Sequence, residues 1–225
     1  MRGLLGARGR RTLLLAAALF LGLGASSALG TPSSADLLAK EVQLGRHTAE
    51  EIEKTWPRVA DPVQTARLEM LLQRLQPYLT RPLPYEMRLV DRKEPNAFAL
   101  PGGICYVTRG MLEFVRSDPE LAAVVAHELI HADRRHGVIQ MARNERMTLL
   151  ALAVAVASRG HAAALLLSNI AQVAVMNSYS RDLEREADSG ALDLLLKTGY
   201  DPAGMVTLLE RLSEEHLKRP YVDKG

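Results

Sequence analysis

Two histidines four residues apart are the side chains whose type and spacing point most directly to chemistry in this sequence. His127 and His131 lie in the segment His-Glu-Leu-Ile-His, which has the pattern H-E-x-x-H. On a helix, residues four apart share one face, so both imidazoles can reach a single cation. Neutral imidazole suits zinc, and two histidines with one further protein ligand leave a fourth position for water. The pattern therefore predicts a catalytic zinc site in which Glu128 accepts a proton from a zinc-activated water.

The residues around the pattern predict the helix that it needs. Ser117 or Asp118 can cap its start, and Pro119 suits the first turn. Glu120 can complete a capping box with Ser117, and Gly137 supplies a stop signal. The core-facing positions are apolar: Leu121, Val124, Val125 and Leu129. A chance occurrence of the pattern is the alternative, but a chance match has no reason to lie in a capped amphipathic helix.

The third ligand is expected from a second acidic segment, residues 179–188. Glu184 and Asp188 are four apart and share a face, so one can bind the metal while the other holds the free N–H of a ligating imidazole. Glu186 points to another face. The spacing leaves these three acids open as ligands. The alternative is a solvated charged face on a helix that ends at Gly199.

Another zinc arrangement is excluded by the residues that follow His131. A metzincin has the pattern H-E-x-x-H-x-x-G-x-x-H, but its glycine position is Arg134 and its last histidine position is Gly137. His136 is one residue out of register. We expect His136 at the C-terminal end of the helix, where a partial positive charge is favoured.

The N-terminus has the organisation of an export signal. Residues 1–30 carry four arginines and no acid, and an apolar run is followed by small residues. We predict a secretory signal peptide that is cleaved after Ala28 or Gly30. An uncleaved membrane anchor is the alternative, because residues 12–30 approach a membrane-spanning length. The remaining chain, residues 31–225, is expected to form a single domain.

Charge and cysteine content restrict the partners and the compartment. The whole chain has a formal charge of +2, which becomes −2 when the four arginines of the signal are removed. Because no basic patch with interleaved aromatic residues remains, nucleic acid is not an expected partner. Cys105 is the only cysteine, which excludes an intrachain disulfide. The signal predicts an exported protein, periplasmic if the chain is bacterial.

Two strongly apolar runs, residues 148–158 and 162–176, follow the metal-binding helix. Neither run reaches the ~18–20 residues needed to cross a bilayer. We expect two buried helices or a flap over the site, with contact to a membrane surface as the alternative. His161 lies at the turn between the two runs.

The other segments predict a mostly helical α+β fold. Alternating residues at 85–91 and short apolar runs at 96–100 and 104–108 predict a small antiparallel sheet, with a hairpin at the Pro-Gly-Gly turn. An unpaired edge of such a sheet can accept an extended peptide as a further strand, and a purely structural hairpin is the alternative. Further amphipathic helices are expected at residues 35–54, 62–79, 179–199 and 201–217.

With these motifs in place, the chain resembles the gluzincin metallopeptidases of family M48, which include the CAAX prenyl protease and the heat-shock peptidase HtpX. The likeness extends from about residue 35 to residue 219. It is strongest in Asn-Ala-Phe-Ala-Leu-Pro-Gly-Gly at 96–103, in the H-E-x-x-H segment, in Arg135-His136 and in Glu-Arg-Glu-Ala-Asp at 184–188. These motifs occur in the order that the family has them.

The resemblance implies a zincin-like domain with one Zn²⁺ bound by His127, His131 and Glu184. It further implies that Glu128 is the general base and that Asp188 supports a ligating imidazole from behind. The strand after the Pro-Gly-Gly turn is implied to border the substrate cleft. Its residues are therefore candidates for substrate binding: Ile104, Cys105, Tyr106 and Val107.

The sequence departs from the family pattern at its C-terminal end. Longer soluble members carry a His-Pro pair that approaches the active site after the last helix seen here, and this chain ends at Gly225 without it. We therefore expect either a truncated sequence or a different donor to the oxyanion, for which Tyr179, Arg181 and His161 are candidates. The multi-span helices of membrane-embedded relatives are also missing.

Together these features predict an exported zinc metalloendopeptidase that hydrolyses peptide bonds in exported or envelope proteins, in protein quality control. One alternative is a zinc-binding chaperone or assembly factor of the cell envelope with little proteolysis. Another is a membrane-surface protein whose zinc is structural. The expected partners are protein or peptide substrates, with peripheral contact to a membrane or to envelope proteins as an addition.

Overall fold

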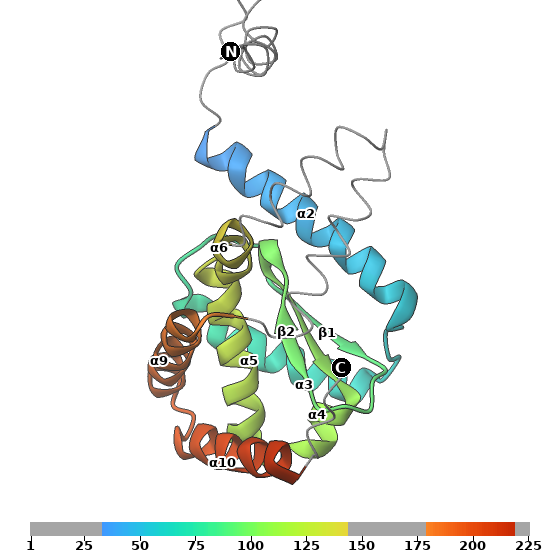
Figure 1. The fold of residues 1–225 in the computed structure, drawn as a ribbon, viewed down its shortest axis with the longest axis vertical. Coiled ribbons are helices and arrows are strands. Elements are labelled where there is room, and N and C mark those ends of the chain that lie inside the picture. The colour runs from blue at the N-terminus through green and yellow to red at the C-terminus, as the bar shows by residue number, and fades with distance from the viewer. Residues whose placement is uncertain (1–32, 144–178, 219–225) are drawn as a thin grey trace, which may run out of the picture. The chain divides into compact units, whose positions relative to one another are not determined.

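The computed structural model describes residues 33–143 and 179–218, which form helices around one small sheet (Figure 1). The helices are α2 (Ser34–Thr55), α3 (Pro62–Leu75), α4 (Arg109–Phe114), α5 (Asp118–Asp133), α6 (His136–Arg143), α9 (Arg181–Thr198) and α10 (Ala203–Lys218), with the short 3₁₀ turns η1 (Gln76–Tyr78) and η2 (Pro101–Gly103). The strands are β1 (Glu86–Val90), β2 (Ala97–Ala99) and β3 (Ile104–Thr108). The predicted α+β fold with a helical majority is confirmed.

Three of the sequence predictions concern segments outside the described residues. They are the signal peptide at 1–30, the apolar runs at 148–158 and 162–176, and the position of His161. Across residues 33–143 and 179–218, no helix combines the length and the apolar character that crossing a bilayer requires.

Helix α5 is the most buried helix of the described residues. Nearly every residue from Glu120 to Asp133 is buried, although the sequence pattern predicted only one core-facing side. The helix is enclosed because α9, α10, α3 and the sheet all pack against it. Polar side chains on such a helix lie in the protein interior, so each needs a partner or a function.

The sheet is mixed, with the strand order β1-β3-β2. β2 and β3 form the predicted antiparallel hairpin, in which Phe98 lies opposite Tyr106. β1 runs parallel to β3, with Met87 opposite Cys105, so the prediction of an antiparallel sheet is wrong for this pair. Alternation along a strand fixes which side chains are buried, but it does not identify the neighbouring strand. β3 is therefore the central strand and is paired on both sides.

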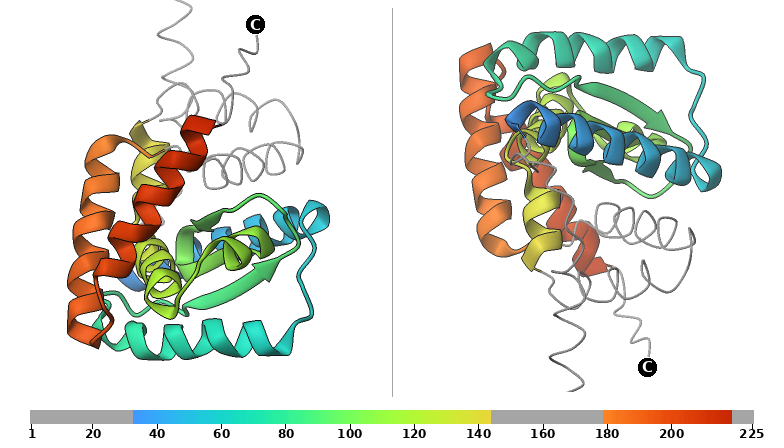
Figure 2. Two further views of the ribbon diagram at one scale, coloured as in Figure 1. Left: turned by 90° about the horizontal axis from the view of Figure 1, so that it is seen from below. Right: turned by 90° about the horizontal axis from the view of Figure 1, so that it is seen from above.

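The two faces of the sheet pack against different helices. Cys105 and Val107 of β3 join the main core with α3, α5 and α9. Ile104 and Tyr106 point to the other face and form a second cluster with Ala49 and Ile52 of α2. In the view from above in Figure 2, α2 crosses over the strands. Every residue of β3 is consequently buried.

Local sequence signals locate most helix ends correctly, but not the end of α5. Ser117 Oγ accepts a hydrogen bond from the Glu120 N–H at 3.4 Å, and α9 ends at Gly199 with a φ of 72°. Gly137, the predicted stop of α5, instead lies inside α6. The helix is interrupted at Arg135, which has a φ of 62°. Arg135 is the one non-glycine residue of the described segments with a positive φ. A side chain with a Cβ rarely adopts this conformation, so composition did not indicate the break.

Helix α2 approaches η2 closely at two glycines. A Cβ atom on Gly45 would lie 1.9 Å from the carbonyl oxygen of Pro101, and one on Gly102 would lie 2.6 Å from the Cα of Val42. Glu41 of α2 also binds Arg81 through two hydrogen bonds of 2.9 and 2.8 Å. These contacts make α2 part of the same compact unit as α5.

Candidate metal centre

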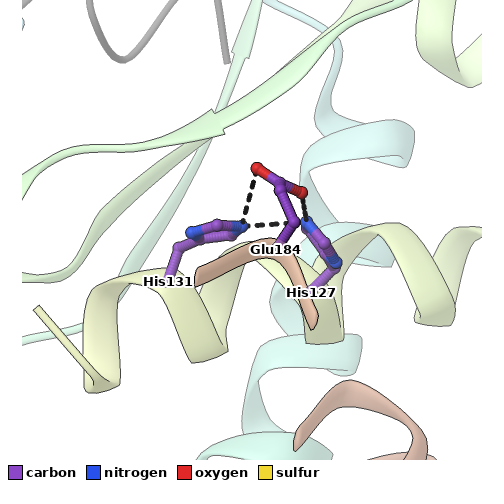
Figure 3. Close-up of side chains that lie close together, drawn as sticks. All are labelled: His127, His131 and Glu184. Carbon is purple, nitrogen blue, oxygen red and sulfur yellow. Dashed lines mark hydrogen bonds and ion pairs between the residues drawn. The ribbon is translucent and has the colours of Figure 1, made fainter. Parts of the chain in front are cut away.

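Helices α5 and α9 bring together three of the predicted ligands, as Figure 3 shows. The Nε2 atoms of His127 and His131 lie 2.9 Å apart. The two oxygens of Glu184 lie 3.5 Å from His127 Nε2 and 3.9 Å from His131 Nε2. The helices approach closely because Gly190 of α9 faces Ile130 of α5, where a Cβ atom on Gly190 would lie 2.9 Å from the isoleucine Cγ2.

The donor set fits a zinc ion. Two imidazole nitrogens and a carboxylate oxygen, all within 4.8 Å of one another, are ligands that zinc takes in catalytic sites. The two Nε2 atoms face each other and can share only one proton, whereas a cation accepts both lone pairs. Beside them, the buried Oε2 of Glu128 has no hydrogen-bond partner in the described structure. Such an unpaired buried oxygen indicates a site that a further group completes.

The environment sets the charge of the two histidines in opposite directions. Burial, with the neighbouring imidazoles of His127 and His136, lowers the pKa of His131 to about 2, so His131 is neutral as a metal ligand must be. Burial acts the same way on His127, but hydrogen bonds to Asp188 and Glu184 outweigh it and raise its pKa to about 10. A metal ion that binds at neutral pH must therefore displace a proton from His127.

Glu128 is buried, with 5% of its surface exposed, and its carboxyl group is close to His127 and to Ala99 of β2. Burial raises the pKa of its carboxyl to about 7, and the charge of Glu184 adds to the increase, whereas His127 and the Ala99 N–H oppose it. A carboxyl group with this pKa can both accept and return a proton near neutral pH. The side chain is therefore suited to general acid–base chemistry.

Comparison with known proteins agrees with this geometry. Residues 62–220 match peptidase family M48. The chain belongs to peptidase family M48. The match includes α5 and α9, which carry the three clustered ligands. The family that the sequence motifs indicated is thus confirmed, and with it the class of metallopeptidase.

Three relatives show how far the likeness extends. The β-barrel assembly-enhancing protease of Escherichia coli K12 is 28% identical over 197 aligned residues, in a match that covers 83% of this chain and 40% of the relative. The mitochondrial metalloendopeptidase OMA1 of Schizosaccharomyces pombe is 32% identical over 132 residues, which are 58% of this chain and 38% of the relative. Metalloprotease YcaL of E. coli K12 is 32% identical over 133 residues, which are 58% of this chain and 52% of the relative. The match thus spans about two fifths of the length of the assembly-enhancing protease and of OMA1.

Asp188 lies where the sequence analysis expected it in this M48 domain. Its Oδ1 atom is 3.1 Å from Nδ1 of His127, on the opposite side of the ring from the ligand atom. A carboxylate at this position holds the proton on Nδ1 and leaves the Nε2 lone pair directed at the metal. Glu186, the third acid that spacing left open, is not in the ligand cluster and lies 3.5 Å from Nε2 of His136.

Two residues contact His131 in a way that the sequence analysis did not predict. His136 is fully buried, and its Nδ1 atom lies 3.0 Å from Nδ1 of His131. Tyr179 stacks on His131 with a centroid distance of 4.2 Å and an interplanar angle of 20°. Tyr179 was considered only as an oxyanion donor, and His136 was assigned to a helix end. No periodic pattern marks either contact, because residue 136 follows a break and residue 179 lies in an irregular segment before α9.

The strand that was predicted to border the substrate is not an edge of the sheet. Ile104, Cys105, Tyr106 and Val107 are buried and belong to the central strand, whose main chain already pairs with β1 and β2. No further strand can be added to β3. The edge strand that reaches the site is β2, where the Ala99 N–H donates to Glu128. Arg181, a second candidate oxyanion donor, is exposed at the start of α9.

Proposed function

We propose that this chain is a zinc-dependent metalloendopeptidase that hydrolyses peptide bonds in proteins, with His127, His131 and Glu184 as zinc ligands. The observation that carries the proposal is Glu128: a buried carboxylate with an unpaired oxygen, beside three converging ligand atoms. A protein that kept zinc only for its structure would have no use for an unsatisfied charged group at that position.

The residues divide the chemistry among them. When bound, zinc supplies a Lewis acid that polarises the scissile carbonyl and lowers the pKa of water. Glu128 takes a proton from the water that attacks the carbonyl carbon, and returns it to the amine nitrogen as the carbon–nitrogen bond breaks. The Ala99 N–H holds the carboxylate in place. Asp188 orients His127 through the ring nitrogen that faces away from the ligand cluster.

The substrate is proposed to lie along β2 in place of the β3 position expected from sequence. β2 is an edge strand of the sheet, and Ala99 connects it directly to Glu128, which supports this location. Binding of an extended peptide beside a strand depends on its main-chain N–H groups at every second residue. N-methylation of a cleaved peptide at successive positions should therefore raise KM in an alternating pattern. A uniform response would contradict this location.

The cellular role is proposed from the N-terminus and the relatives. The predicted export signal at residues 1–30 supports secretion, and a relative whose match covers 83% of this chain is named as a β-barrel assembly-enhancing protease. We propose that residues 31–225 form the metallopeptidase domain, which acts on envelope proteins in quality control. N-terminal sequencing of the protein from a periplasmic extract should show cleavage after Ala28 or Gly30. Recovery of the uncleaved chain in the membrane fraction would favour an N-terminal anchor.

The activity is tested with purified, zinc-loaded protein and casein as an unfolded substrate. Wild-type protein should cleave casein, lose activity with a chelator and regain it with added zinc. Glu128→Gln should keep one zinc per chain and lose cleavage, whereas Glu69→Gln, on the exposed face of α3, should behave as wild type. Zinc binding with suppression of casein aggregation and no cleavage would favour the assembly-factor alternative. Unfolding on chelation, with an unaffected Glu128→Gln variant, would favour structural zinc.

A further inference from the structure

The break between α5 and α6 changes the environment of the second zinc ligand. In an uninterrupted α-helix, a residue five positions after His131 would point about 140° away from it around the axis. Arg135, with a φ of 62°, interrupts the helix and places His136 at the start of α6 with its ring against His131. The two ring centroids are 4.8 Å apart and the rings are nearly perpendicular, at 82°.

The left-handed conformation of Arg135 costs free energy, and the surrounding contacts hold it in place. Arg135 Nε lies 3.0 Å from Oε2 of Glu41, a buried carboxylate that also binds Arg81. On the other side of the break, Asp133 is buried and accepts hydrogen bonds from the N–H groups of Thr80 and Arg81 and from the hydroxyls of Thr80 and Tyr85. Both ends of the break are therefore anchored to segments distant in the sequence.

The hydrogen bond between the two histidines permits only one useful proton arrangement. His131 must keep the lone pair of Nε2 for the cation, so its proton is on Nδ1. That proton is donated to Nδ1 of His136, 3.0 Å away, and the proton of His136 then resides on Nε2. This second nitrogen is buried without a hydrogen-bond partner in the described structure, and an oxygen of Glu186 lies 3.5 Å from it.

We propose that His136 is a positioning residue for His131. Nδ1 of His136 accepts a hydrogen bond from the Nδ1–H of His131, and the ion pair between Arg135 and Glu41 keeps His136 in place. The inference rests on the proposed function only in taking His127, His131 and Glu184 as the zinc ligands. Each ligating histidine then has its own partner behind the ring, Asp188 for His127 and His136 for His131. The left-handed Arg135 thus serves the metal site without touching it.

Three variants of the full chain separate an acceptor role from a packing role. His136→Asn places an amide oxygen near the position of Nδ1 and keeps the acceptor. His136→Gln places its amide one bond further along, near the position of Nε2, and His136→Leu fills the space without an acceptor. The zinc dissociation constant is measured by competition with a chromophoric chelator. The Leu and Gln variants should bind zinc about 10–100-fold more weakly than wild type, and the Asn variant within about threefold of it.

A spectroscopic readout accompanies the affinity measurement. In zinc-loaded wild type and His136→Asn, proton NMR should show the Nδ1 proton of His131 as a downfield, slowly exchanging resonance, and the Gln variant should lack it. If His136→Leu does not fold, the Asn and Gln pair decides the question alone. Equal zinc affinity for Asn and Gln variants would overturn the inference. A wild-type chain that binds no zinc would instead overturn the proposed function.

Discussion

Helix α5 carries two buried glutamates eight positions apart, and their surroundings are opposite. Glu120 is 4% exposed, and both of its oxygens are paired: with Arg211 at 2.5 and 2.7 Å, with the Thr207 hydroxyl at 2.9 Å and with the Arg116 N–H at 2.7 Å. Glu128 is 5% exposed, and its Oε2 atom has no hydrogen-bond partner in the described structure. The two carboxylates are therefore equally buried, but they differ in how many hydrogen-bond partners the protein gives them.

The difference appears in the pKa values. Hydrogen bonds from Arg211 lower the pKa of Glu120 to about 2, whereas burial raises the pKa of Glu128 to about 7. A fully paired carboxylate remains charged and ties α5 to α10. An incompletely paired carboxylate exchanges its proton near neutral pH and is available to a substrate. Partners rather than burial thus distinguish a structural glutamate from a reactive one.

The largest expected effect is on activity, from Glu128→Gln. Loss of the proton acceptor should lower kcat about 10³-fold with little change in KM. Thermal stability should stay equal or rise, because the variant removes an uncompensated buried charge. Turnover of a quenched fluorescent peptide and a thermal melt of the same preparation give both values. Retention of more than a tenth of the activity would contradict the assignment of Glu128 as the base.

Glu120→Gln should lower stability and leave the specific activity unchanged, which is the reverse of the result expected for Glu128→Gln. Arg211 would lose the counter-charge of a buried pair, which should lower the free energy of unfolding by about 3 kcal/mol. The zinc site is formed by other residues, so the fraction that remains folded at low temperature should keep its specific activity. Urea denaturation and peptide turnover at 15 °C measure these quantities. An unaffected unfolding midpoint would show that the pair contributes no net stability.

Stability against pH should separate the two glutamates in chelator-treated protein. In the folded chain Glu128 has a pKa of about 7, above the ordinary glutamate pKa of 4.5, so unfolding releases its proton between these pH values. Wild type should therefore lose stability relative to Glu128→Gln as pH rises from 4.5 to 7, by on the order of 2 kcal/mol. Glu120 has a lowered pKa, so its stabilisation is present above pH 4.5 and is lost as pH falls toward 2. Urea unfolding at pH 5 and pH 8 provides the test, and a constant difference between wild type and Glu128→Gln would refute it.

The smallest effect is expected for a carboxylate that is paired but exposed. Asp193 lies 2.6 Å from Lys197 on α9, and the two side chains are 63% and 52% exposed. Asp193→Asn should change the free energy of unfolding by less than about 0.5 kcal/mol, because water solvates both charges. A change as large as that of Glu120→Gln would mean that pairing matters without burial.

The sequence was most informative where helical spacing alone determines geometry. His127 and His131, and likewise Glu184 and Asp188, share faces because they are four apart, and the structure brings both pairs to one place. Spacing could not decide among the three acids, because that choice depends on how α9 crosses α5. Glu184 and Asp188 face the histidines of α5, whereas Glu186 lies beside His136.

The missed features depend on conformation and not on periodicity. Gly137 was taken as the helix stop, but the break occurs at Arg135, and its left-handed φ requires contacts with Glu41 that no local pattern reveals. The position of His136 behind His131 follows from that break and was missed with it. The order of the strands was missed for a similar reason, since alternation in β1 carries no information about its partner.

Helix α2 precedes the residues that match the family, yet the domain depends on it. Gly45 packs against Pro101, and Glu41 neutralises both Arg81 and Arg135. A protein fragment that begins at residue 62, where the family match begins, would leave Arg81 and Arg135 without the carboxylate of Glu41. It would also expose Phe98 and Tyr106 to water. Such a fragment should aggregate, whereas one begun at residue 33 should stay in solution. Helix α2 lies outside the family match, but it covers one face of the sheet and supports the folded domain.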